Sequence, residues 1–217
     1  MRIQWMLAIV LIVGMQVLAA DAPAGIVVDP AKKSVTIPAK VAPRKLAALT
    51  EIYPVEVIAC WPTEKKGEKA HETVVVFDVK PSEVHKALES FGLKPGKPAM
   101  GEGDKAEGPE VMVFLELPDG KKVPIEKTLL DKKTGKPMPK LKWYFTGSVM
   151  TQPNPEKDEK VYGADMTGTL VGIFPVTNQV VIQTNLTMKD EPLLKLETDK
   201  KLLPPEGTAV KLIIEAK

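Results

Sequence analysis

Residues 51–98 decide the fold, and they read EIYPVEVIACW (51–61), PTEKKGEKA (62–70), HETVVVFDV (71–79) and KPSEVHKALESFGLKPGKP (80–98). Apolar side chains alternate in the first part, a lysine-rich segment follows, and a run of β-branched residues comes next. These patterns predict a strand over Val55–Trp61, an exposed loop over 62–70 and a strand over Thr73–Val79. The second strand has apolar residues on both faces, so we expect it to lie in the middle of a sheet covered on both sides.

A helix is predicted directly after this second strand, over Pro81–Phe91. Proline at the first helical turn costs no backbone hydrogen bond, and Gly92 is suited to end the helix in a left-handed conformation. The spacing i, i+3, i+4, i+7 predicts one buried stripe, formed by Val84, Ala87, Leu88 and Phe91.

The rest of the chain is read as mostly strands. A β-hairpin is predicted over Val111–Leu117 and Lys122–Ile125, with Asp119-Gly120 in its turn. Other strands are predicted over 141–149, 161–164, 168–174 and 179–184, with a last strand within 203–216. The expected fold class is therefore α+β: a strand-dominated mixed or antiparallel sheet with one clear helix, Pro81–Phe91, packed on it.

The N-terminus has the composition of an export signal. Arg2 precedes an apolar run, Trp5–Leu18, which ends in small residues of the A-x-A type that a signal peptidase cleaves. We expect a signal peptide over 1–20, a linker or edge hairpin over 21–44 and a single domain over 45–217. The location would be periplasmic or extracellular, with no membrane span after cleavage. The alternative is an uncleaved anchor helix.

Charge and cysteine content exclude several classes of site. Without Arg2 the chain has 29 basic and 28 acidic residues, a net charge of +1, which gives no electrostatic reason to expect nucleic acid as a partner. The single cysteine, Cys60, cannot form an intramolecular disulfide, a C-x-x-C site or an iron–sulfur cluster. It is expected to be a buried residue within a strand.

Several separated blocks of sequence resemble the YdjY-like domain of exported bacterial proteins of the planctomycete type. The blocks lie at 56–60, 69–76, 80–98, 143–148, 162–172 and 204–210, and the similarity covers about 45–215. The resemblance implies an exported envelope protein and identifies no reaction. Some relatives are described as ferredoxin-like or associated with iron–sulfur proteins. This chain departs from them, since one cysteine cannot hold a cluster, and we carry over no redox role.

One cluster of side chains could build a metal site. His71, His85, Cys60 and Glu72 would suit zinc or copper if the helix returned over its own strand and brought the two imidazoles together. Two alternatives stay open: the histidines have only structural hydrogen bonds, or His71, Glu72, His85 and Trp61 line a ligand pocket. A nucleophilic role for Cys60 is disfavoured by its position inside a strand.

The sequence therefore favours a non-catalytic binding or assembly module that contacts an envelope protein or a small ligand. It contains no G-x-S-x-G, no H-E-x-x-H and no glycine-rich phosphate loop. The alternative is a metal-binding or hydrolytic domain that uses His71, Glu72 and His85.

Overall fold

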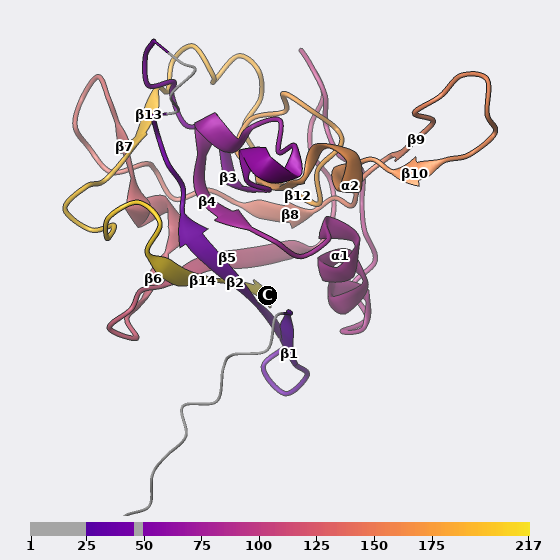
Figure 1. Cartoon of the computed structure of the whole chain (residues 1–217), viewed down its shortest axis with the longest axis horizontal. Helices are drawn as coiled ribbons and strands as arrows, with labels where there is room; N and C mark the ends of the chain where they lie inside the picture. Colours follow the sequence, from indigo (N-terminus) through magenta and orange to yellow (C-terminus); the bar gives the residue numbers. More distant parts are fainter. Residues whose placement is uncertain (1–24, 46–49) are drawn as a thin grey trace, which may run out of the picture.

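Eight strands close into a mixed barrel in the computed structural model, which describes residues 25–45 and 50–217 (Figure 1). In order around the barrel they are β2 (Ser34–Val41), β14 (Ala209–Ala216), β5 (Glu110–Glu116), β8 (Trp143–Phe145), β12 (Ile182–Thr184), β11 (Thr169–Gly172), β3 (Val57–Cys60) and β4 (Thr73–Phe77). Pairing of β4 with β2 closes the ring. The pairs β3–β4 and β11–β12 are parallel, and the other neighbours are antiparallel.

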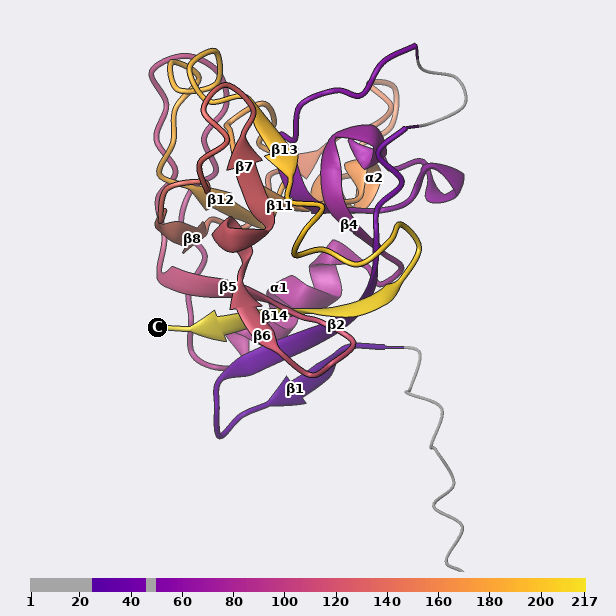
Figure 2. The same ribbon diagram turned by 90° about the vertical axis from the view of Figure 1, so that its left-hand side faces the viewer.

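Six short strands lie outside the eight-strand ring. At its margins β1 (Val27–Asp29) pairs with β2, and β6 (Lys122–Pro124) pairs with β5. Two further pairs stand outside it: β9 (Met150–Thr151) with β10 (Val161–Tyr162), and β7 (Leu129–Asp131) with β13 (Leu196–Thr198). Figure 1 shows β9 and β10 as an arm that projects from the body, and Figure 2 shows β7 and β13 side by side. Three short 3-10 turns, η1 (Thr63–Lys65), η2 (Ala70–Glu72) and η3 (Ile125–Thr128), lie in the connections.

The core is formed by the inward-facing side chains of the strands. Alternation is clear in β2, where Val35, Ile37, Ala39 and Val41 are buried and the residues that separate these four are more exposed. In β3, β11 and β12 every residue is buried, because these strands are covered on both faces.

Two α-helices lie in the described part of the chain: α1 (Pro81–Glu89) and α2 (Ala164–Thr167). Helix α1 buries Val84, Ala87 and Leu88 of the predicted stripe, and Gly92 has the expected positive φ of 82°. The helix ends at Glu89, so Phe91 lies in the turn after it and is only half-buried. Neither of these helices has the length and apolar character that a membrane crossing needs.

The predicted fold class is confirmed: the structure is strand-dominated, and the expected helix begins at Pro81. The strand expected over 141–149 is shorter, and only Trp143–Phe145 pair in the sheet. Within the range predicted as a linker or edge hairpin, β1 and β2 pair as a hairpin. Strand β2 also pairs with β14 on one side and with β4 on the other. The predicted signal peptide over 1–20 lies outside the described residues.

Pro38 explains why β2 could be mistaken for an edge strand. On one side of β2, β1 pairs with Ser34–Thr36 and β4 pairs with Ala39–Val41, so Pro38 falls between the two partners. A missing backbone N–H costs no ladder bond at such a gap. The proline is therefore compatible with a strand inside the sheet.

Candidate functional site

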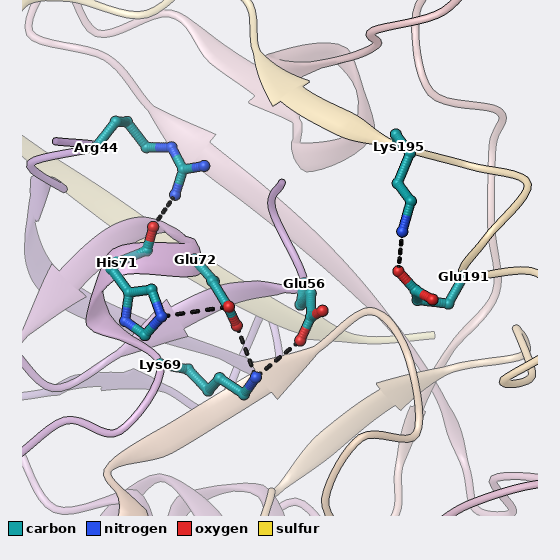
Figure 3. A network of polar contacts seen from close by, with 7 residues as sticks. All are labelled: Arg44, Glu56, Lys69, His71, Glu72, Glu191 and Lys195. Carbon is teal, nitrogen blue, oxygen red and sulfur yellow. Dashed lines mark hydrogen bonds and ion pairs between the residues drawn. The ribbon is translucent and has the colours of Figure 1, made fainter. Parts of the chain in front are cut away.

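Glu72 is the centre of one group of predicted site residues, at the turn that leads into β4. Its carboxylate lies 2.6 Å from Lys69 Nζ and 3.2 Å from His71 Nε2, and Lys69 Nζ also contacts Glu56 at 2.8 Å (Figure 3). The 3-10 turn η2 places Lys69, His71 and Glu72 together, and β3 begins directly after Glu56. The result is a chain of polar contacts, Glu56–Lys69–Glu72–His71, in which Lys69 lies between two carboxylates. Figure 3 also shows Glu191 paired with Lys195, apart from this chain.

Burial and ion pairing shift the pKa values of Glu56 and Lys69 in opposite directions. Burial raises the pKa of Glu56 above its usual value, although Lys69 acts to lower it. For Lys69, burial acts to lower the pKa, but hydrogen bonds to Glu56 and Glu72 outweigh it and the pKa is raised. The lysine is therefore held as a cation between two carboxylates.

Arg44 lies next to this group and is almost fully buried, at 6% exposure. Its Nη1 donates to the carbonyl oxygens of His71, at 2.6 Å, and Thr73, at 3.4 Å, and its Nη2 donates to the carbonyl of Tyr53. Its backbone N–H donates to Glu206 Oε1 at 3.0 Å. Burial lowers the pKa of Arg44, and Glu72 and Glu206 act against that shift. Arg44 thus ties three backbone segments together while remaining charged.

His85 belongs to a second group, built by α1 and β10. Its Nδ1 lies 2.6 Å from the hydroxyl of Tyr162, and its Nε2 lies 3.4 Å from Glu89. The Nδ1–hydroxyl contact is a hydrogen bond whose donor is set by the tautomer of the imidazole. The phenolic oxygen in turn accepts the backbone N–H of Ser148 at 3.1 Å. Burial raises the pKa of Tyr162, which keeps the phenol protonated.

Cys60 and Trp61 have packing roles. Cys60 is fully buried, its thiol lies 3.7 Å from the carbonyl oxygen of Thr167, and burial raises its pKa. Trp61 donates from Nε1 to the carbonyl of Val79 at 2.7 Å. Its side chain lies against Gly168, where an added Cβ would come within 2.5 Å of Trp61 Cβ. The expectation of a buried thiol within a strand is confirmed.

The structure does not bring the four predicted metal ligands together. His71 contacts Glu72 and Tyr53, whereas His85 contacts Glu89, Tyr162 and Phe145, so the two imidazoles have separate neighbours. Across residues 25–45 and 50–217, no group of three or more His, Cys, Asp or Glu side chains is placed to hold a metal ion. The reason is geometric: His71 is in the turn before β4 and His85 is in the helix after it, at opposite ends of that strand.

A hollow of about 270 Å³ lies beside Arg44 and was not predicted from the sequence. The connection between β13 and β14, yellow in Figure 2, borders it and is hydrogen-bonded to Val41 at the end of β2. Its lining consists of Val41, Arg44, Thr198, Lys200, Leu203, Pro204, Pro205 and Glu206. One signal could have indicated it: arginine occurs only at positions 2 and 44 in a lysine-rich chain. An arginine in a chain that otherwise uses lysine indicates a position where several N–H donors in one plane are needed.

Comparison with known proteins gives one match. A family model described as the YdjY domain matches residues 26–215. No curated protein and no solved structure matches the chain. The family match begins at the residue before β1 and so includes β1 and β2 together with the rest of the barrel.

Proposed function

Given that this chain belongs to the YdjY domain family, we propose that it is a non-catalytic binding or assembly module of the cell envelope, and that it binds in the hollow beside Arg44. The partner would be a small ligand or a segment of an envelope protein. Export is part of the proposal and rests on the composition of residues 1–20.

The observation that carries the proposal is a buried cation in the wall of a hollow. Arg44 is held by three backbone carbonyls and lines a space with both apolar and charged walls. Ligand sites combine mostly apolar walls with a few fixed polar groups. Because Arg44 is fixed before a ligand arrives, little side-chain entropy is lost on binding.

The pairing of the other candidate residues supports binding over catalysis. Glu72 is engaged by Lys69 and His71, and His85 is engaged by Tyr162 and Glu89. A catalytic acid or base needs access to the proton of a substrate. The alternative of a metal-binding or hydrolytic domain that uses His71, Glu72 and His85 has no observation of this kind in its favour.

The test is a fragment screen against the isotopically labelled protein, read by amide chemical shifts. We expect neutral or charged fragments to shift Val41, Thr198 and Leu203, and to leave Tyr162 unchanged. Shifts that cluster around His85 and Tyr162 instead would contradict the proposal. So would near-stoichiometric zinc or copper that is lost in both His71→Ala and His85→Ala.

A further inference from the structure

We propose that the hollow beside Arg44 binds a monocarboxylate attached to a short aliphatic group. The inference rests on the proposed function, because it names the class of ligand for the same site. It follows from the donors left on Arg44, the net charge of the walls, and the size and composition of the space.

Arg44 has N–H donors left for a ligand. A guanidinium carries five N–H donors. Three carbonyls, those of Tyr53, His71 and Thr73, use donors on Nη1 and Nη2. The Nε–H and one hydrogen of Nη2 have no acceptor in the described part of the chain. Two donors on one planar group suit the two oxygens of a carboxylate.

The charge of the walls fits a single negative charge. Arg44 and Lys200 are cationic and Glu206 is anionic, so the lining has a net charge of +1. Arg44 is buried, whereas Lys200 and Glu206 are exposed at the rim. A monoanion would neutralise the site, and a dianion such as a phosphate ester would meet excess negative charge beside Glu206. The walls therefore favour a carboxylate over a phosphate.

The size and the other walls point to a short aliphatic group. The volume of about 270 Å³ lies just below the range of drug-sized pockets, which begins at about 300 Å³. At about 30 Å³ of liquid volume per water molecule, it holds the equivalent of roughly nine waters. The apolar lining consists of Val41, Leu203, Pro204 and Pro205. The two proline rings restrict the backbone at the mouth, so the apolar wall is largely preformed.

The first experiment titrates the purified full-length protein with N-acetyl-L-leucine and, separately, with N-acetyl-L-leucinamide. We expect saturable amide shifts at Val41, Thr198 and Leu203 with the acid, and binding at least about tenfold weaker with the amide, because the amide lacks the charge. The tripeptide Ala-Ala-Leu and its C-terminal amide form a second pair. Binding of both acids would mean that the site accepts peptide C-termini, and binding of N-acetyl-L-leucine alone would restrict it to small free acids.

Two lysine variants distinguish the effect of a charge in the lining of the hollow from the effect of the same charge elsewhere on the surface. Lys200→Glu reverses a charge in the lining, whereas Lys201→Glu makes the same change at the next exposed residue, outside the lining. We expect Lys200→Glu to lower the affinity for N-acetyl-L-leucine about tenfold and Lys201→Glu to change that affinity less than about twofold. Both sites are exposed, so both variants should fold.

The outcomes also separate this inference from the proposed function. Equal affinity for the acid and its amide, equal effects of the two lysine variants, or inorganic phosphate binding as tightly as the acid would each overturn the carboxylate assignment. In those cases the hollow would still be a binding site. If no fragment of any charge shifts the residues of the hollow, the proposed function fails as well.

Discussion

Glu56 is a single residue whose ionisation is opposed by its surroundings. Burial raises its pKa above the usual 4.5, so the folded chain holds this proton more tightly than the unfolded chain. A folded state that binds more protons loses stability as pH rises. The contribution of Glu56 to the free energy of unfolding should therefore fall as pH rises from about 4.5 through its raised folded-state pKa.

The variant Glu56→Gln tests this contribution. It removes the ionisable group, so we expect a smaller decline in the free energy of unfolding above pH 4.5 than in the original chain. Urea unfolding at a series of pH values measures the difference. Glu64→Gln is the matched control, because Glu64 is an exposed glutamate on η1. An unchanged pH profile for Glu56→Gln would show that burial does not dominate at this residue.

Tyr162 is a half-buried tyrosine whose ionisation is opposed by the folded state. Burial raises its pKa above the usual 10, so the folded state favours the neutral phenol, which lies 2.6 Å from His85 Nδ1. Because the folded-state pKa is the higher one, stability from this group is complete below pH 10 and is lost as pH rises beyond it. Urea unfolding at a series of pH values above 10 should show a steeper decline in the free energy of unfolding for the original chain than for Tyr162→Phe. An equal decline in the two chains would refute the expectation.

At the scale of elements, α1 takes its N-terminal cap from α2. The N-cap residue Lys80 makes no side-chain capping bond. Asp165 supplies it from a distance: Oδ1 accepts the backbone N–H of Ser82 at 2.8 Å and Oδ2 accepts its hydroxyl at 2.5 Å. The carboxylate also lies at the positive end of the helix dipole. This contact fixes α1 to the short helix that precedes β11.

Asp165→Ala should destabilise the protein by about 1–2 kcal/mol, because it leaves the Ser82 donors without an acceptor. Thermal and urea unfolding measure the loss. The control is Glu83→Ala, which removes an exposed carboxylate from the first turn of α1 itself and should cost less than about 0.5 kcal/mol. Equal losses in the two variants would mean that only the charge near the helix end matters.

The elements that could be predicted are those with a local signal. For α1, residues close together in the sequence show the buried stripe and the terminal glycine. The Asp-Gly turn between β5 and β6 is likewise a local signal. Strands β7 and β13 have three residues each and pair across more than sixty residues of chain, so they have no periodicity to detect. The cap of α1 was hidden for the same reason, since Asp165 is 83 residues from Ser82.

The candidate site was harder to predict than the helices and strands, because its residues meet only when the barrel closes. Sequence proximity grouped His71 with His85, but the strand between them separates their side chains. Arg44 and Glu206 are 162 residues apart and meet only because β2 and β14 are neighbours in the barrel. The residue types indicated which side chains could bind a ligand, and the strand order determined which of these side chains lie close together.

At the scale of the whole molecule, β2 is the strand on which closure depends. It pairs with β14 over seven residue pairs and with β4 over three, and the second set joins the two ends of the sheet. Burial of Val35, Ile37 and Val41 is worth about 5–9 kcal/mol in apolar surface alone. That is comparable to the whole net stability of a typical domain, about 5–15 kcal/mol.

A chain that begins at residue 45 should therefore fail to fold cooperatively, although the sequence of residues 21–44 predicts only a linker or an edge hairpin. Its loss of β2 would expose the open edges of β14 and β4, which invites aggregation. A chain that begins at residue 25 keeps β1 and β2, and we expect it to give a single cooperative thermal transition. Scanning calorimetry and gel filtration of the two chains, side by side, make the comparison. A cooperative transition in the shorter chain would show that the barrel does not need β2 and that the domain begins after it.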